Sequence, residues 1–444
     1  MTLAAHVPGS ARVRTRLLGA RRVVWFEFVD TGRGVPLTAE MAMVMETGAL
    51  TAFEERLPLV LVMSSAGADI GQGIAPLHGW GRVARALNRC SGVVPVIAIL
   101  DGPAVSGPAL LLGLADLVVA TERSYAFVNG THTVERFTGV AITKDELGSA
   151  DTLARSAGVA ALTAPDRAAA TDVVADVLAR LPDHVDQPAP HEPVADPVDR
   201  SCPEAGELIP DTPTGSYDVR AVAEAIVDDG SLLEVHSRWA GNIVTAFATI
   251  GGRSVGVVAN QPMNLAGTLD IPASQKGARF VALCDSFNLP IVTMVDTPGF
   301  YPGKDLEWRG MIRHGAQLVY AYGRATVPRV CVILRKSYGG AYIVMDSKTM
   351  GNDVCLAWPS AEIAVMGAGQ AAAILRRGAP DEERAEFETD YAERLLNPYV
   401  AAERGFVDAV IAPADTRREV AGALSMLAGK RERIAPRRHG NNPL

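Results

Sequence analysis

The sequence lacks any apolar run long enough to span a membrane. Its longest apolar stretches, such as Leu110–Ala115 with its flanks, are broken by glycine, aspartate or proline well short of the roughly 20 residues that a spanning helix needs. The N-terminal stretch Met1–Arg22 contains arginines but no apolar block followed by a small-residue cleavage site, which argues against a secretory signal. We therefore expect a soluble, cytoplasmic protein.

Cysteine is scarce and widely spaced. There are 5 cysteines and no Cys-x-x-Cys pair. This excludes a four-cysteine zinc ribbon and argues against a fold held together by disulfides. No metal site is predicted. The cysteines are Cys90, Cys202, Cys284, Cys331 and Cys355.

Positive charge is not in excess either. The net charge of −8 argues against a nucleic-acid partner, which would call for a broad basic surface. The basic stretch Lys430–Arg438 leaves two interpretations open, a site for phosphate or another polyanion and a solvated tail that packs on a neighbouring subunit.

The chain has the size and composition of two globular domains. Its 444 residues are 48% hydrophobic and 21% charged, which predicts large cores and two domains of roughly 200 residues each. The segment 181–216 is rich in proline, aspartate and glutamate and shows no sustained apolar periodicity, as is typical of a linker. We expect a first domain over 1–180, this linker over 181–216, and a second domain over 217–444.

The two halves repeat one another. Leu57–Met63 leads to Gly67 as Leu289–Val295 leads to Gly299, with an offset of 232 positions. Further on, an apolar run from Pro95 precedes Ser106-Gly107, and a similar run from Pro328 precedes Gly339-Gly340, with an offset of 233. Two motif pairs at nearly the same interval indicate a tandem of two like domains.

Each repeated unit predicts a strand, a glycine-containing turn and a helix. The apolar runs are short and rich in valine and isoleucine, as in the buried strands of an α/β fold. A turn of this kind at a helix start brings backbone N–H groups close to a ligand. Two such turns could hold an oxyanion, and losing one donor typically costs about 3 kcal/mol of transition-state stabilisation. Glycine pairs also serve close packing, so the pattern alone leaves both roles open.

Two catalytic motifs occur in contexts that do not suit them. Gly252-Arg-Ser-Val-Gly256 fits the nucleophile-elbow pattern but lies between two strand-like runs, which predicts a hairpin turn instead. Gly367-Ala-Gly-Gln-Ala-Ala372 follows a strand-like run as a dinucleotide fingerprint would, but the acidic residues about 20 positions later lie in a charged helical stretch rather than at a strand end.

Seven segments of the second half form a recognisable set of motifs. They are Val258-Ala-Asn-Gln-Pro262, Asp296-Thr-Pro-Gly-Phe-Tyr-Pro-Gly303, Ile312-Arg-His-Gly-Ala316, Tyr338-Gly-Gly-Ala-Tyr342, Ala357-Trp-Pro-Ser-Ala-Glu-Ile-Ala-Val-Met-Gly-Ala368, Asn397-Pro-Tyr-Val-Ala-Ala-Glu-Arg-Gly405 and Arg438-His-Gly-Asn-Asn-Pro-Leu444. With these motifs the chain resembles the carboxyltransferase (beta) subunits of biotin-dependent acetyl-/propionyl-CoA carboxylases. The resemblance runs almost continuously from Tyr217 to Leu444, whereas the first half is shortened and divergent.

This resemblance implies a tandem of two crotonase-like (ClpP/crotonase) α/β domains. It also implies a hexamer, with each active site shared between the first domain of one subunit and the second domain of another. The implied partner carries biotin and the biotin carboxylase, and this chain has no Met-Lys-Met biotinylation segment. The implied reaction moves a carboxyl group from carboxybiotin to the α-carbon of an acyl thioester, through an enolate held by backbone donors.

Individual site residues follow from the same resemblance. It implies that Gly299, Phe300, Gly339, Gly340 and Ala341 hold the biotin ureido oxygen. It implies that the corresponding first-half residues Gly67, Ala68, Ser106 and Gly107 hold the thioester enolate. Tyr338 is expected in a pocket wall or the core, and Ala368 in a turn near biotin.

Three positions depart from the family pattern. Asp69 replaces the usual arginine, a charge reversal where the CoA phosphates are expected, so affinity for CoA is in question. Ser106 stands where the second turn usually has glycine. Ile343 stands where propionyl-type relatives often have aspartate, which fits a more apolar acyl-pocket wall and equally fits helix packing.

The function expected from these features is carboxyl transfer to a small acyl-CoA or to a specialised acceptor, such as an acyl group on a carrier protein. Two alternatives stay open. One is a decarboxylase that uses the same enolate chemistry in reverse, and the other is a non-catalytic scaffold within a carboxylase complex.

Overall fold

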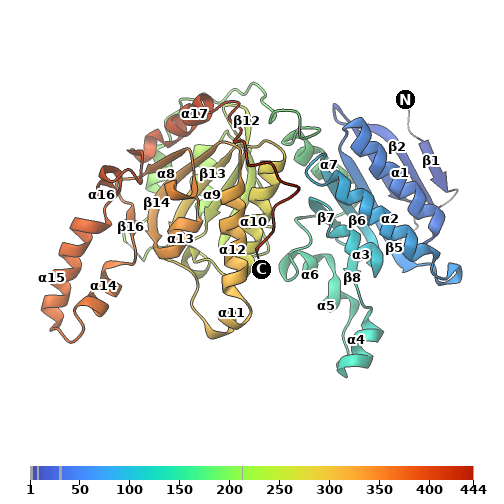
Figure 1. Ribbon diagram of the computed structural model, residues 1–444, viewed down its shortest axis with the longest axis horizontal. Coiled ribbons are helices and arrows are strands. Elements are labelled where there is room, and N and C mark those ends of the chain that lie inside the picture. Colours follow the sequence, from blue (N-terminus) through green and yellow to red (C-terminus); the bar gives the residue numbers. More distant parts are fainter. Residues whose placement is uncertain (1–3, 8–9, 30–32, 213, 444) are drawn as a thin grey trace. The chain divides into compact units, whose positions relative to one another are not determined.

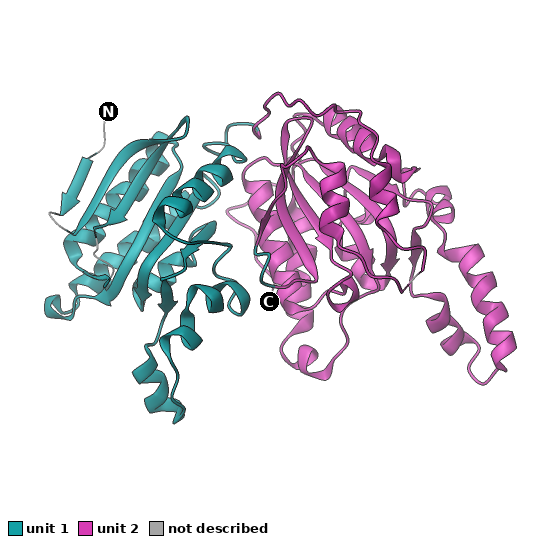
Figure 2. Cartoon of the chain, turned by 180° about the vertical axis from the view of Figure 1, so that it is seen from behind, with its two compact units in different colours: residues 1–188, 236–239 teal, residues 189–235, 240–444 magenta. Residues whose placement is uncertain are grey.

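The protein is described by a computed structural model that covers residues 4–7, 10–29, 33–212 and 214–443. The chain divides into two compact units, coloured separately in Figure 2. The first comprises residues 1–188 and His236–Trp239, and the second comprises residues 189–235 and 240–444. Over the described ranges, no helix is both long enough and apolar enough to cross a membrane.

The first unit is built on a mixed sheet in the order β1-β2-β3-β5-β6-β7-β9. The antiparallel strands β1 to β3 lie at one side, and the strands from β3 onward pair in parallel. Two short strands extend it, β4 beside β5 and β8 beside β6. The strands are β1 (Ala4–Val7), β2 (Ala11–Leu18), β3 (Arg21–Phe28), β4 (Val35–Leu37), β5 (Leu59–Ala68), β6 (Val96–Val105), β7 (Leu117–Thr121), β8 (Tyr125–Phe127) and β9 (Leu162–Ala164).

The second unit repeats this plan in a sheet of order β10-β11-β12-β13-β14-β15-β17, with β16 beside β14. Strand β11 returns into β12 through an antiparallel hairpin that pairs Ile250 with Arg253, so the predicted hairpin at Gly252–Gly256 is confirmed. The strands are β10 (Leu233–Val235), β11 (Ile243–Ile250), β12 (Arg253–Asn260), β13 (Ile291–Thr297), β14 (Arg329–Tyr338), β15 (Val354–Ala357), β16 (Glu362–Ala364) and β17 (Ala409–Val410).

The central strands of the two sheets are equivalent in register. Leu59 of β5 pairs with Val96 of β6, and Ile291 of β13 pairs with Arg329 of β14. These pairs are related by the offsets of 232 and 233 positions that the sequence motifs show. Residues Val96–Leu100 are all buried, as expected for a strand covered on both faces.

Each sheet is covered by a pair of long helices that pack against each other (Figure 1). In the first unit these are α1 (Ala39–Glu55) and α2 (Ala75–Cys90), and in the second α10 (Ile271–Ser286) and α12 (Met311–Arg324). Thr38 caps α1 by accepting the N–H of Met41, and Asp270 caps α10 by accepting that of Ala273. The remaining α-helices are α3 (Gly107–Leu112), α4 (Thr131–Thr138), α5 (Lys144–Gly148), α6 (Ala150–Arg155), α7 (Arg167–Ala179), α8 (Pro203–Glu207), α9 (Val219–Ile226), α11 (Lys304–Trp308), α13 (Gly339–Val344), α14 (Ala368–Leu375), α15 (Asp381–Tyr391), α16 (Pro398–Glu403) and α17 (Thr416–Met426).

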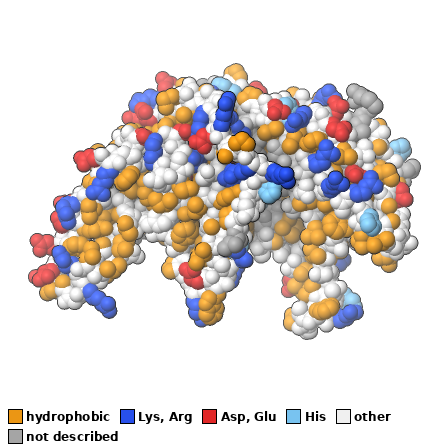
Figure 3. Space-filling view, viewed as in Figure 1, with side chains coloured by type: hydrophobic (Ala, Val, Ile, Leu, Met, Phe, Trp, Pro, Cys, Tyr) orange, Lys and Arg blue, Asp and Glu red, His pale blue; other side chains and the backbone are white. Residues whose placement is uncertain are grey.

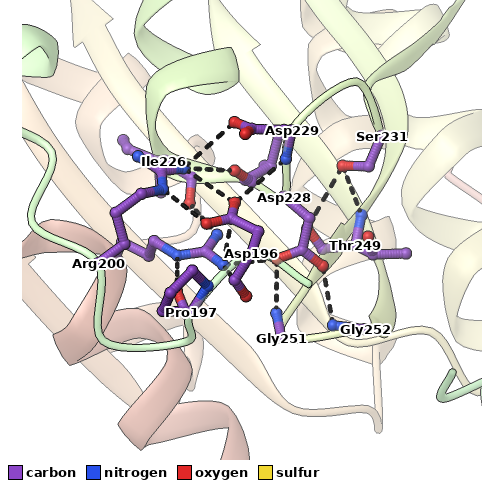
Figure 4. A network of polar contacts seen from close by, with 12 residues as sticks. Asp196, Pro197, Arg200, Ile226, Asp228, Asp229, Ser231, Thr249, Gly251 and Gly252 are labelled. Carbon is purple, nitrogen blue, oxygen red and sulfur yellow. Dashed lines mark hydrogen bonds and ion pairs between the residues drawn. The ribbon is translucent and has the colours of Figure 1, made fainter. Parts of the chain in front are cut away.

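Most of the segment expected to be a linker packs against the second unit. Residues 189–212 and 214–216 belong to the second compact unit. Figure 4 shows the network that fixes them, in which Asp196 pairs with Arg200 at 2.7 Å. Arg417 of α17 donates to the carbonyl of Pro197 at 2.9 Å and to Asp228 at 2.6 Å. The proline-rich composition therefore marks an irregular segment that polar bonds hold in place.

Candidate active site

The first of the two turns is built in the same way in both units. In the second unit, Phe300 forms a parallel bridge with Leu269: the N–H of Leu269 donates to the carbonyl of Gly299 (3.1 Å), and the N–H of Tyr301 donates to the carbonyl of Leu269 (2.9 Å). Neither bond uses the N–H of Phe300. Gly299 has φ +140°, a conformation that favours glycine.

In the first unit, Ala68 takes the place of Phe300. Leu37 of β4 pairs with Ala68, and the N–H of Asp69 donates to the carbonyl of Leu37 at 2.9 Å. Gly67 has φ +110°. Leu37 and Leu269 are themselves 232 positions apart, so the turns match in strand pairing as well as in backbone conformation.

The second turn also recurs, at the start of α3 and of α13. Ser106 (φ +61°) and Gly339 (φ +60°) occupy equivalent positions. Helix α3 begins directly after Ser106, at Gly107, and α13 begins at Gly339 itself, followed by Gly340. The first N–H groups of a helix have no acceptor within it, and the helix dipole favours negative charge there. Each unit thus brings two sets of backbone donors to one end of its parallel strands.

Ser106 shapes the turn through its backbone conformation, but its N–H is not free to bind a ligand. Its N–H donates to the carbonyl of Phe127 in β8 at 3.0 Å, so the N–H of Gly107 is the first that the helix start leaves without an intrahelical acceptor. A non-glycine residue at this backbone conformation costs of order 1–3 kcal/mol. Strained backbone conformations of this kind are common at functional sites.

An aromatic ring covers the helix-start glycine in both units, but it comes from different elements. A Cβ atom added to Gly340 would lie 3.6 Å from the ring of Phe300, and one added to Gly107 would lie 2.9 Å from the indole of Trp80. Phe300 belongs to the first turn, whereas Trp80 belongs to α2. The sequence did not single out Trp80, because the equivalence appears only when the two folded turns are compared.

The second unit has a cavity of about 520 Å³ directly at its second turn. Gly339, Gly340 and Ile343 line it, so the structure brings these three predicted residues together. The rest of the lining was not predicted as a set, although parts of it lie in the segments Ala357–Ala368 and Asn397–Gly405. It consists of Ile363, Ala364, Val365, Tyr391, Leu395, Val400, Ala401, Arg404 and Phe406, with Tyr342 beside Ile343.

Most of the side chains that line this cavity are apolar, although Arg404 also reaches it. Val365 is exposed, as are Ile374 and Leu375 of α14. Figure 3 shows hydrophobic side chains gathered over the part of the second unit that carries α14 and α15. The cavity therefore suits an uncharged ring system that presents a polar oxygen to the backbone donors.

The remaining predicted residues of this unit lie around the cavity rather than in its lining. Tyr338 is buried, its ring packs on Gly367, and its hydroxyl donates to the carboxylate of Glu362. Burial raises the pKa of Tyr338 well above its usual range, so this hydroxyl stays protonated. Ala341 is buried in α13, and Ala368 begins α14 next to Gly367.

Asp69 caps a short turn in the first unit. Its carboxylate accepts the N–H of Gly71 at 2.9 Å and so caps the 3-10 turn Ile70–Gln72. Aspartate is favoured at such a cap. The cap explains why this side chain is compatible with the turn.

Comparison with known proteins agrees with this arrangement. Residues 22–442 match the family model described as the carboxyl transferase domain. The propionyl-CoA carboxylase beta chain of Saccharopolyspora erythraea is 44% identical over 430 residues, which cover 93% of this chain and 77% of that one. The methylmalonyl-CoA decarboxylase subunit alpha of Veillonella parvula is 42% identical over 388 residues, which cover 87% and 76%.

A solved structure shows the same fold. Transcarboxylase 12S, a hexamer crystallised with hydrolysed methylmalonyl-coenzyme A, superposes with a TM-score of 0.95 at 41% identity. The match covers 99% of this chain and 86% of that one. The predicted tandem of crotonase-like domains and the predicted family are both confirmed. The chain belongs to the carboxyl transferase domain family, that of the carboxyltransferase subunits of biotin-dependent acyl-CoA carboxylases.

Proposed function

We propose that this chain transfers a carboxyl group between carboxybiotin, carried on a partner protein, and the α-carbon of a small acyl-CoA. The observation that carries the proposal is the matched pair of donor turns. In the first unit, the N–H groups of Ala68 and Gly107 suit the enolate oxygen of a thioester. In the second unit, the N–H groups of Phe300 and Gly340 suit the ureido oxygen of biotin.

The biotin side fits the group that the family implies. The cavity at Gly339 and Gly340 has room for a fused ring system and apolar walls such as Ile343 and Val400. When bound there, carboxybiotin supplies carbon dioxide and a basic nitrogen. This chain contributes the donors of Phe300 and Gly340, which stabilise negative charge on the ureido oxygen, and a mostly apolar lining that contacts the ring.

The acyl side supplies stabilisation of the enolate. Removal of the α-proton moves negative charge onto the thioester oxygen, and the N–H groups of Ala68 and Gly107 favour that charge over the neutral ground state. The enolate carbon then forms a bond to carbon dioxide, and the α-proton goes to the biotin nitrogen. No acid–base side chain is required in this scheme.

The assembly and acceptor extend the proposal. We propose a hexamer, as in transcarboxylase 12S, with a biotin-carrying alpha subunit as partner. Acetyl- or propionyl-CoA is the expected acceptor. Because the negative charge of Asp69 disfavours the CoA phosphates, an acyl group on another carrier is the alternative acceptor.

Decarboxylation is the second candidate, because a methylmalonyl-CoA decarboxylase subunit is among the relatives at 42% identity. It uses the same two pairs of donors, with the carboxyl group leaving the acyl-CoA for biotin. The direction depends on the partner that consumes carboxybiotin.

The test uses the full chain with the biotin carboxylase and carrier partner, ATP and radiolabelled bicarbonate. We expect label in acetyl- or propionyl-CoA. Label in neither, with methylmalonyl-CoA decarboxylated in the presence of biotin carrier, would replace the first candidate with the second. No transfer in either direction, together with no acyl-CoA binding by calorimetry, would contradict both carboxyl transfer and decarboxylation. The remaining interpretation would be a non-catalytic scaffold.

A further inference from the structure

A buried carboxylate connects the two strands that lead to the donor turns of the second unit. Asp296, in the last residues of β13, is 2% exposed. Its Oδ1 accepts the N–H of Lys336 in β14 at 3.1 Å, and its Oδ2 accepts the hydroxyl of Tyr217 at 2.8 Å and Nε of Arg335 at 3.0 Å. One carboxylate thus joins both strands that lead to the donor turns.

Arg335 extends this contact to a third segment of the chain. Its Nη1 donates to the carbonyls of Thr212 (3.3 Å) and Gly215 (2.8 Å), and its guanidinium lies 5.1 Å from the ring centre of Tyr217. Arg335 is 6% exposed. The Asp296 brace, as we call Asp296, Arg335 and Tyr217, therefore has partners for its charges although it is buried.

The brace lies at the point where the pairing of β13 with β14 shifts its register. Val295 pairs with Ile333, but Thr297 pairs with Ser337, so β14 has two extra residues at this irregularity. The N–H of Lys336 belongs to this bulged stretch, and the carboxylate of Asp296 accepts it in place of a strand carbonyl. Bulges redirect a strand, and this one directs β14 toward Gly339, while β13 ends three residues before Phe300.

The first unit has the same irregularity without the brace. Met63 pairs with Leu100 and Ser65 with Ala104, the same displacement as in the second unit. Ser64 occupies the position of Asp296, and Gly102 (φ +130°) that of Arg335. The bulge therefore forms without an ion pair, so forming it does not account for Asp296 and Arg335.

We propose that the Asp296 brace positions the donor turns Gly299–Phe300 and Gly339–Gly340 relative to each other for the biotin side of the reaction. Asp296, Arg335 and Tyr217 are positioning residues that act through the backbone N–H groups of these turns. The inference rests on the proposed function for its effect on turnover, but its effect on backbone order does not depend on that function.

The first variant is Asp296→Asn, and its matched control is Asp228→Asn. Asp228 is also a buried carboxylate of the second unit that pairs with an arginine, Arg417. It accepts two backbone N–H groups, those of Gly251 (2.9 Å) and Gly252 (2.8 Å), as Figure 4 shows. Its partners do not belong to the donor turns or to the cavity lining. Tyr217→Phe removes a single hydroxyl and serves where Asp296→Asn does not fold.

Two readouts decide the proposal. In Asp296→Asn without biotin, amide hydrogen exchange should accelerate at least about fivefold in peptides covering 297–303 and 336–344. The Asp228→Asn control should accelerate exchange near 251–252 and leave those peptides unchanged. In the transfer assay, kcat should fall about 10- to 100-fold in Asp296→Asn and less in Tyr217→Phe, with KM for acyl-CoA within about twofold of wild type.

The outcomes separate this inference from the proposed function. Unchanged exchange at both turns in folded Asp296→Asn and Tyr217→Phe would overturn the brace, whatever the enzyme's activity. Accelerated exchange at both turns in a chain whose wild type transfers no carboxyl group would support the brace and contradict the proposed function. Equal loss of kcat in Asp296→Asn and Asp228→Asn would reduce the brace to a general stability effect and overturn it.

Discussion

Asp69 carries a negative charge at the place where the resemblance implies an arginine beside the CoA phosphates. Its carboxylate caps a local turn through the N–H of Gly71, and asparagine can keep that cap without the charge. The sequence alone predicts the charge reversal but not the cap, because capping depends on the backbone that the folded turn provides.

Replacing Asp69 with arginine should lower KM for CoA thioesters about 3- to 10-fold at low ionic strength, since an arginine binds phosphate through charge-assisted hydrogen bonds. The gain should shrink as salt is added. Asp69→Asn is the matched control and should give a smaller gain. Steady-state kinetics would contradict this account if KM were the same for wild type and Asp69→Arg, because the phosphates would then bind elsewhere.

Trp80 offers a direct probe of the acyl side. Its half-buried indole covers Gly107, where we propose that the thioester oxygen binds. Propionyl-CoA should therefore change the tryptophan fluorescence of the wild type, and Trp80→Phe should remove most of that change. Trp358, which is buried and donates to Thr416 in the second unit, is the control position. A change that survived in Trp80→Phe would exclude Trp80 as its source.

At the scale of elements, the strands could be predicted from the sequence, but the side-chain hydrogen bonds and ion pairs between them could not. The apolar runs after Pro95 and Pro328 predicted β6 and β14, because buried parallel strands need continuous apolar sequence. No sequence pattern relates Tyr217 to Arg335, which lie 118 positions apart and come into contact only in the folded second unit. Likewise, composition marked 181–216 as a linker, whereas the bonds between Arg417 and the stretch at Asp196 depend on tertiary folding.

Helix α10 carries a buried amine whose titration can be measured. Lys276 is 2% exposed, and its Nζ donates to the carbonyls of Ile243 (2.7 Å) and Ala240 (3.4 Å). Burial lowers the pKa of Lys276 to about 7. Between this value and the unfolded lysine pKa of about 10.4, the unfolded chain binds more protons, so stability should rise with pH.

The comparison with Lys276→Met isolates this effect. Between pH 7.5 and 9, the free energy of unfolding of the wild type should rise by about 1 kcal/mol per pH unit relative to the variant. Denaturant unfolding at several pH values gives both curves. Parallel curves would show that Lys276 keeps an ordinary pKa in the folded protein.

At the scale of the whole molecule, the tandem duplication could be predicted from two motif pairs, because similar motifs repeated at nearly the same interval indicate an internal repeat. The structure adds that the two donor turns match in pairing and conformation, down to Leu37 and Leu269. It also adds an asymmetry. The second unit has a braced pair of turns and a cavity, whereas the first has Ser64 and Gly102 in place of the brace and Trp80 in place of Phe300. We interpret this as two sites of one origin adapted to different ligands.

The central claim is that the two donor turns of the second unit act on the biotin side alone, and Gly340→Val tests it most directly. A Cβ at Gly340 fits at 3.6 Å from Phe300, so Gly340→Ala is the milder control, while the branched valine projects into the cavity. We predict that Gly340→Val lowers carboxyl transfer to propionyl-CoA at least about 100-fold and leaves the Kd for propionyl-CoA, measured by calorimetry, unchanged. Transfer at the wild-type rate in folded Gly340→Val would contradict the account.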